Sequence, residues 1–303
     1  MNNLFSAEWN TASEHQIDGL QSDYRKPRDW QEPAFNLLKD HPYMIVNAPT
    51  GSGKSWLMCM LSAYKMQNDK NLKCIISVPQ TIIAPGFSNE KIQINNDINL
   101  HWKPNHNLCK EQTGKRPVRY AIEWLERKTY DSFNDRILLC THATLVRIYK
   151  KLKIEDRLNL LDRLLLWIDE AHHISIETDG LANGIGKLVS FLFKNEALSP
   201  QIGLTTATLF RGDRQQLIHA SMAASFEKYE LPLDKYLKTM KHLRSFNYDF
   251  LLCGHDYTKA MGDIIKHKKG KDIVWIPHTV SQHSSGDKYL EAKKIIQEYQ
   301  DVN

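Results

Sequence analysis

The sequence has no long hydrophobic run, few cysteines and only a small excess of one charge. No stretch approaches the roughly 20 apolar residues that span a bilayer, so we expect no membrane segment. The polar first residues, which include acids, argue against a secretory signal. The five cysteines are scattered without a CxxC pair, which is typical of reduced thiols and predicts a cytoplasmic protein. The net charge of +5 permits binding to nucleic acid without requiring it.

What the sequence does have is an alternation of short apolar runs with longer amphipathic stretches. The 303 residues, 42% of them hydrophobic, suffice for more than one domain. The runs are uninterrupted, as expected for strands buried on both faces of a parallel sheet. They cover residues 43–46, 74–78, 137–140, 164–168, 202–204 and 273–276. Helical patterns lie between them, for example over 54–66 and 119–127, and the alternation predicts an α/β fold.

A phosphate-binding motif follows the first run, where residues 48–55 read Ala-Pro-Thr-Gly-Ser-Gly-Lys-Ser. Glycines let the backbone approach phosphates closely, the lysine supplies charge to the β- and γ-phosphates, and the last serine offers Mg²⁺ a hydroxyl. A chance Gly/Ser turn before Lys-Ser is the alternative, but a predicted strand, loop and helix surround the motif in the required order. The residues that we expect at the phosphates are Thr50, Gly51, Ser52, Gly53, Lys54 and Ser55.

A pair of carboxylates follows the run 164–168, in the order Asp169-Glu170-Ala171-His172. Ligands bind at the carboxyl ends of the strands in open α/β folds. Asp169 is therefore placed to hold the hydration shell of Mg²⁺, and Glu170 to orient and deprotonate the attacking water. A solvated helix cap is the alternative. We interpret His172 and the next histidine as a hydrogen-bonding relay rather than as zinc ligands.

These motifs together resemble those of superfamily 2 helicases and translocases, the DEAD/DEAH-box-like group that includes restriction-enzyme motor subunits. Upstream, Arg28-Asp29-Trp30-Gln31 is similar to the family's R-x-[YW]-Q element. The resemblance implies that Arg28 lies at the nucleotide and that Gln31 reads the adenine edge. An N-terminal helix with a buried Trp30 is the alternative.

Three further segments resemble family motifs that contact nucleic acid or couple it to hydrolysis. They are Val78-Pro79-Gln80, the stretch 141–145 that begins Thr-His-Ala-Thr, and the stretch 203–208 that ends Thr-Thr-Ala-Thr. The residues implied are Pro79, Gln80, Thr141, His142, Thr206 and Thr208. Polar loops are the alternative for the first two segments. Segment 101–120 mixes basic residues with Trp102 and Tyr120, as in a nucleic-acid interface or in a solvated insert.

The resemblance implies a P-loop NTPase of RecA-like type, with a parallel sheet and helices on both faces. We expect a polar lead-in over 1–27, the ATP-binding helicase domain over 28–227, and a linker with the beginning of an incomplete second RecA-like domain over 228–303. The family's arginine finger has no match in 279–303, so turnover by this chain should be weak. A partner or the remainder of a longer chain would supply that arginine; Arg211 or Arg214 acting in cis is the alternative.

We therefore predict an ATP-dependent helicase or translocase that couples hydrolysis to movement on nucleic acid, with DNA favoured over RNA. The catalytic residues would be Lys54, Asp169 and Glu170, and the cofactors ATP and Mg²⁺. A duplex translocase that does not separate strands fits the same motifs. From another class, an ATP-binding switch or interaction subunit with little turnover, whose site a partner completes, remains open.

Overall fold

The computed structural model describes residues 4–12, 26–94, 98–110, 116–174, 184–207, 220–238 and 243–251. The chain divides into two compact units: one is His15–Thr239, and the other combines Met1–Glu14 with Met240–Asn303. Within the described ranges, no helix has the length and apolar character needed to cross a bilayer.

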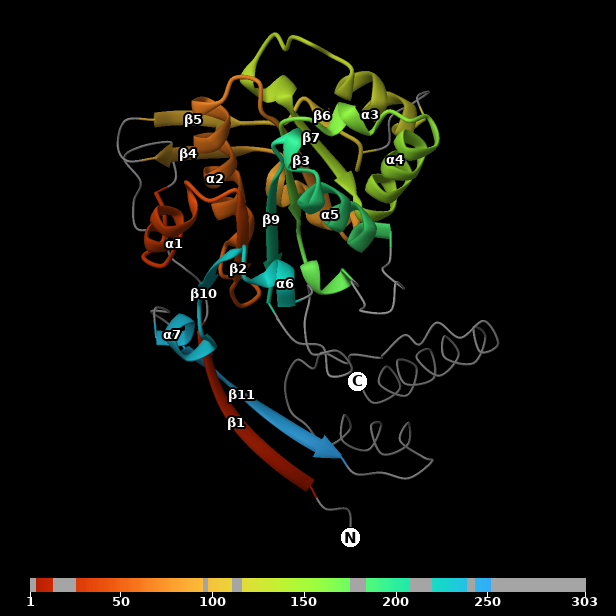
Figure 1. The fold of residues 1–303 in the computed structure, drawn as a ribbon. Coiled ribbons are helices and arrows are strands. Elements are labelled where there is room, and N and C mark those ends of the chain that lie inside the picture. Colours follow the sequence, from red (N-terminus) through yellow and green to blue (C-terminus); the bar gives the residue numbers. More distant parts are fainter. Residues whose placement is uncertain are drawn as a thin grey trace, which may run out of the picture. The chain divides into compact units, whose positions relative to one another are not determined.

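The larger unit is built on a seven-stranded sheet in which every neighbouring pair is parallel (Figure 1). The strand order is β10-β2-β9-β8-β3-β7-β6. These strands are β2 (Tyr43–Asn47), β3 (Lys73–Val78), β6 (His106–Asn107), β7 (Ile137–Thr141), β8 (Leu164–Ile168), β9 (Gln201–Thr206) and β10 (Glu227–Glu230). Every apolar run that falls on described residues forms a strand, so the predicted α/β fold with a parallel sheet is confirmed.

Helices cover both faces of this sheet (Figure 1). The helices of the larger unit are α1 (Gln31–Leu38), α2 (Lys54–Asn68), α3 (Pro117–Leu125), α4 (His142–Ile154), α5 (Gly184–Lys194), α6 (Ala220–Ala223) and α7 (Leu233–Lys238). Short 3₁₀ turns lie at Thr81–Phe87, Phe133–Arg136, Leu158–Leu161, Ala171–His173 and Glu196–Leu198.

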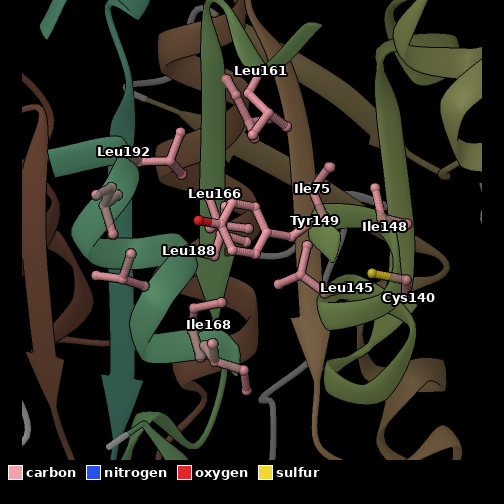
Figure 2. Packing of buried hydrophobic residues seen from close by; sticks show 14 of the residues in the cluster. Ile75, Cys140, Leu145, Ile148, Tyr149, Leu161, Leu166, Ile168, Leu188 and Leu192 are labelled. Carbon is pink, nitrogen blue, oxygen red and sulfur yellow. The ribbon is translucent and has the colours of Figure 1, made fainter. Parts of the chain in front are cut away.

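Strand β8 shows why the strand sequences are apolar without interruption. Leu166 and Ile168 pack into the cluster that also contains Tyr149 of α4 and Leu188 of α5 (Figure 2). Trp167 lies on the opposite face, where its Nε1 donates a hydrogen bond to Ser62 Oγ of α2 at 2.8 Å. Successive side chains of a strand point to opposite faces, and here both faces are covered by helices.

The segment after β3 forms an antiparallel hairpin that the sequence did not indicate. Its strands are β4 (Glu90–Ile94) and β5 (Ile98–Trp102). Trp102 is buried and its Nε1 donates to the Phe87 carbonyl at 3.0 Å. Tyr120 is half-buried, with its hydroxyl 2.6 Å from His106 Nδ1. Trp102 therefore packs within the protein, and Tyr120 is held against His106.

The smaller unit contains the antiparallel pair β1 (Leu4–Ala12) and β11 (Leu243–Leu251), with Leu4 opposite Leu251. The polar lead-in expected over 1–27 thus contains a strand, β1, that the sequence analysis did not predict. Its partner lies at the other end of the chain, so no local pattern reveals the pairing.

The boundary expected near residue 228 is also corrected, because β10 and α7 belong to the larger unit. Strand β10 pairs with β2 at the edge of the sheet. Its sequence, Glu-Lys-Tyr-Glu, lacks the apolar run that marks the inner strands. The elements predicted over 257–267, 272–276 and 288–299 lie outside the described residues.

Candidate functional site

The loop after β2 has the backbone geometry of an anion-binding turn. Gly51 has φ +78° and Gly53 has φ +96°, conformations that residues with a side chain rarely adopt. Gly53 is the N-cap of α2, so the loop leads directly into a helix whose free N–H groups and dipole favour an anion. A Cβ on Gly53 would lie only 2.8 Å from Gln31 Nε2, which gives a second reason for glycine there.

Lys54 is the first residue of α2, and its side chain is buried. Its Nζ donates to the carbonyl oxygens of Ala48 at 2.8 Å and Pro49 at 3.2 Å. Burial lowers the pKa of Lys54, while the negative charges of Glu170 and Asp169 act in the opposite direction. Because β2 and β8 are parallel strands of one sheet, the loop lysine and the two carboxylates that follow these strands lie at the same edge of the sheet.

The segment before α1 holds the outer side of the loop. The Arg28 guanidinium donates to the carbonyl oxygens of Gly51 at 3.0 Å and Ser52 at 2.6 Å. Trp30 is buried, and its Nε1 donates to the Ser52 carbonyl at 3.1 Å. This element therefore lies beside the phosphate loop, where Trp30 has both a packing and a hydrogen-bonding role.

Gln31 connects this segment to the start of α2. Its Nε2 donates to the Gly53 carbonyl at 2.8 Å, and its Oε1 accepts from the Arg28 N–H at 2.8 Å. Gln31 is 1% exposed, so its amide is fixed in place by these contacts. The structure therefore assigns it a loop-supporting contact in addition to the adenine contact that remains a prediction.

The acidic pair begins immediately after β8. Asp169 is buried, and its Oδ1 accepts a 2.7 Å hydrogen bond from the Thr205 hydroxyl of β9. Burial raises the pKa of Asp169; the Thr205 hydrogen bond lowers it, and the charge of Glu170 raises it further. An ionised Asp169 is therefore stabilised by a hydroxyl of β9, a strand that is distant from the phosphate loop in sequence but lies between β2 and β8 in the sheet.

Glu170 has a left-handed backbone, with φ 51° and ψ 54°. A non-glycine residue in this region is uncommon and strained, and such residues cluster at functional sites. Its Oε2 lies 3.2 Å from His172 Nδ1, so the two side chains form an ion pair when the imidazole is protonated.

The residues present fit a nucleoside triphosphate with Mg²⁺. The Ser52 hydroxyl is buried and has no hydrogen-bond partner among the described residues, which leaves a donor in the loop for an oxygen atom. No group of three His, Cys, Asp or Glu side chains in the described ranges could hold a metal ion by itself. Mg²⁺ commonly binds through one or two carboxylates together with water and substrate phosphates, and Asp169 with Ser55 suits that mode.

Residues 22–211 match the family described as type III restriction enzyme, res subunit (ResIII). The match covers more than half of the chain and contains both the phosphate loop and the acidic pair. The chain belongs to this family. A Bacillus subtilis (strain 168) relative named "Putative ATP-dependent helicase YeeB" is 30% identical to the ResIII chain over 281 residues. That alignment covers 90% of the ResIII chain and 44% of the relative, so the chain spans less than half of the relative's length.

Two solved structures resemble the ResIII chain. The Pyrococcus furiosus Hef helicase domain is 17% identical with a TM-score of 0.46, covering 69% of this chain and 39% of that one. The DUF1998 helicase MrfA bound to DNA and AMPPNP is 14% identical with a TM-score of 0.49, covering 87% of this chain and 36% of that one. Both TM-scores lie below 0.5, so the family assignment depends on the sequence matches.

The expected nucleic-acid contacts of the ResIII chain differ in how accessible they are. Gln80 is exposed and Pro79 half-buried, directly after β3 at the same edge of the sheet as the acidic pair. Thr141 ends β7 and caps α4, where its hydroxyl accepts from the Thr144 N–H at 3.2 Å. Thr206 is buried at the end of β9, and Thr208 lies outside the described residues.

His142 corrects one expectation, because its ring does not lie on an exposed nucleic-acid face. The residue is 8% exposed, with Nδ1 2.7 Å from Ser77 Oγ and Nε2 2.9 Å from the Asp169 carbonyl oxygen. It is the first residue of α4, at the ends of β3 and β8, so the ring is enclosed between strands rather than presented to solvent.

Tyr236 of α7 is a residue of the site that sequence reasoning missed. It is buried, and its hydroxyl would lie 3.8 Å from a Cβ on Gly51. Burial raises the pKa of Tyr236, whereas the charge of Arg28 and a hydrogen bond with Arg28 lower it. The polar pattern of α7 gives no local signal for this contact, which arises because β10 returns the chain to the edge of the sheet beside β2.

Proposed function

We propose that this chain is an ATP-hydrolysing motor region of a nucleic-acid helicase or translocase. The observation that carries the proposal is that Lys54, after β2, lies at the same edge of the parallel sheet as Asp169 and Glu170, after β8. A phosphate loop facing two carboxylates is the arrangement that phosphoryl transfer to water requires. Membership of the ResIII family, and similarity to a relative named as an ATP-dependent helicase, support the same function. We further propose that the smaller unit belongs to a second RecA-like domain.

In this proposal the loop binds the triphosphate. Lys54 exchanges the carbonyls of Ala48 and Pro49 for β- and γ-phosphate oxygens, a stronger charge-assisted interaction. The backbone N–H groups at the start of α2 point at the same oxygens. Arg28 and Gln31 keep the loop carbonyls turned outward, and Gln31 also reads the adenine edge.

Hydrolysis uses the acidic pair. Mg²⁺, when bound, neutralises charge that develops on the phosphate oxygens. Ser55 and Asp169 would hold it, Asp169 largely through water, with Thr205 fixing the orientation of the Asp169 carboxylate. Glu170 orients the attacking water and accepts its proton, the role of a general base.

Movement on nucleic acid would use the surface at the ends of β3 and β7. Gln80, Pro79 and Thr141 are the contacts that we propose there, with DNA favoured over RNA as the track. We propose that turnover by the chain alone is low, because an arginine finger supplied from elsewhere is worth about 10³–10⁵ in rate. That arginine would come from a partner or from the rest of a longer chain.

Binding of ATP to the purified chain tests the proposal at its first step. Loss of one charge-assisted hydrogen bond to phosphate corresponds to about 1.5–3 kcal/mol, so Lys54→Ala should weaken Mg²⁺-dependent ATP binding by about 10–100-fold. Lys187→Ala, which removes an exposed lysine on α5, is the matched control and should leave the affinity unchanged. Equal ATP affinity in all three proteins would contradict the proposal.

A further inference from the structure

The buried ring of His142 lies between two groups that belong to different strands. Its Nδ1 is 2.7 Å from the Ser77 hydroxyl near the end of β3, and its Nε2 is 2.9 Å from the Asp169 carbonyl after β8. His142 itself begins α4, directly after β7. One imidazole thus connects the ends of three neighbouring strands, two of which are followed by the proposed nucleic-acid contacts.

The chemistry of the two partners fixes the proton positions on this ring. A carbonyl oxygen can only accept, so Nε2 carries a hydrogen and donates it to Asp169. In the neutral imidazole Nδ1 is then an acceptor, and the Ser77 hydroxyl donates to it. These two contacts therefore favour the neutral tautomer of His142 that carries its hydrogen on Nε2.

Ser77 also holds the N–H side of Asp169. The Asp169 N–H donates to the Ser77 carbonyl at 2.9 Å. Ser77 thus accepts from the Asp169 N–H with its backbone and reaches the Asp169 carbonyl through His142. The N–H and the carbonyl of Asp169 are both fixed within one closed set of hydrogen bonds.

The carbonyl that His142 holds belongs to the peptide bond between Asp169 and Glu170. Because a peptide unit is planar, fixing its oxygen also fixes the direction of the Glu170 N–H, and with it the plane from which the φ of Glu170 is measured. That φ is 51°, in the left-handed region that a glutamate adopts only when its surroundings require it. His142 supplies a hydrogen bond that retains this conformation.

We propose that His142 is a positioning residue for Glu170, acting through the Asp169–Glu170 peptide bond. The inference deepens the proposed function, since it assigns the group that holds the general base in its reactive orientation. It also replaces the expected contact between His142 and nucleic acid with an interior role. Because α4 begins at His142, a shift of the α4 start on binding nucleic acid would move this hydrogen bond and alter the orientation of Glu170.

Two amide variants distinguish the roles of Nε2 and Nδ1 of the His142 ring. The Gln side chain places an N–H donor near the position of Nε2, so His142→Gln can keep the hydrogen bond to the Asp169 carbonyl. The Asn side chain is shorter and reaches only the position of Nδ1, beside Ser77. Both variants replace a buried ring by a smaller amide. If His142 served only in packing, both variants would therefore lose stability and activity to a similar extent.

Single-turnover ATP hydrolysis, with enzyme in excess over ATP, measures the chemical step even when turnover is slow. We expect His142→Asn to lower its rate constant by about 10–100-fold, as for other groups that orient a catalytic residue. ATP affinity should be nearly unchanged, and His142→Gln should retain most of the rate. Equal rates in the Asn and Gln variants, or a loss confined to ATP affinity, would overturn the proposal.

A second readout does not depend on hydrolysis. In a crystal structure of His142→Asn we expect the Asp169–Glu170 peptide to have rotated and Glu170 to have a negative φ, while His142→Gln keeps φ near 51°. An unchanged Glu170 in the Asn variant would overturn the inference. If the wild-type chain hydrolyses ATP no faster than Lys54→Ala, the proposed function fails, and this structural comparison still decides the role of His142.

Discussion

The Thr205 hydroxyl donates a 2.7 Å hydrogen bond to Oδ1 of the buried Asp169 carboxylate. Thr205 lies on β9 and Asp169 directly follows the neighbouring strand β8, so the sheet itself brings them together. Burial raises the pKa of Asp169, and this hydroxyl acts against that rise. The pair thus decides over which pH range a buried carboxylate is available to a cation.

Replacing Thr205 by Val should weaken Mg²⁺-dependent ATP binding and shift its loss on acidification to higher pH. Without the hydroxyl, the pKa of Asp169 rises further, because only the stabilising hydrogen bond to the carboxylate has been removed. Loss of a hydrogen bond to a charged group corresponds to about 1.5–3 kcal/mol, or at least about 10-fold in affinity. Titration of ATP affinity against pH, with and without Mg²⁺, measures both effects.

Thr205→Ser retains the hydroxyl and is the matched control, so its profile should follow the wild type. The sign for stability is opposite to that for binding, because binding needs the ionised carboxylate whereas burial favours the protonated one. A carboxyl whose pKa is raised in the folded state stabilises the fold below its unfolded pKa, and this contribution is lost as pH rises through the folded pKa. Identical acid limbs for Thr205→Val and wild type would contradict the assigned role.

Gly203→Ala should destabilise the larger unit. A Cβ on Gly203 would lie 2.2 Å from Cε3 of Trp167, far inside van der Waals contact. The Trp167 indole is fully buried and hydrogen-bonded to Ser62, so it cannot move aside freely. Overpacking of this kind costs about 1–3 kcal/mol, measurable as a lower midpoint in urea unfolding.

Gly86→Ala provides the comparison for that experiment. Gly86 is exposed, and a Cβ there would meet only Ser55 Oγ at 3.9 Å, an ordinary contact. Its unfolding midpoint should stay close to the wild type. A Gly203→Ala protein as stable as Gly86→Ala would show that the Trp167 packing is looser than the structure indicates.

Gln31→Ala should lower ATP affinity and remove any preference for ATP over GTP. The amide already donates to the Gly53 carbonyl at 2.8 Å, so its loss loosens the phosphate loop, and an adenine contact would be lost at the same time. The expected decrease for ATP is about 10-fold, the size of one buried hydrogen bond. Competition between ATP and GTP for the site measures it; equal losses for both nucleotides would mean that Gln31 acts only through the loop.

The elements that the sequence predicted share one property: each has a local pattern. The uninterrupted apolar stretch of β8 and the Gly-Lys-Ser turn before α2 are visible within ten residues, so the strands and the phosphate loop could be placed directly. The carboxylate pair could be placed because it follows a strand, and strand ends meet at one edge.

What the sequence could not predict depends on contacts between distant segments. Strand β10 is polar because it lies at the sheet edge, and β1 pairs with a strand from the far end of the chain. The enclosed ring of His142 and the approach of Tyr236 to Gly51 require the order of strands, which no local pattern gives. Motif position suggested that His142 mattered, but only the structure showed which groups it touches.

Steady-state ATP hydrolysis shows whether this chain is a motor driven by nucleic acid. We would measure this chain without nucleic acid and with single-stranded DNA, duplex DNA and RNA, using Glu170→Gln as the control. The account predicts a low basal rate that rises with nucleic acid, most with DNA, and is lost in Glu170→Gln. Tight ATP binding with no turnover under any of these conditions would contradict an autonomous motor and would indicate a site that another domain or partner completes.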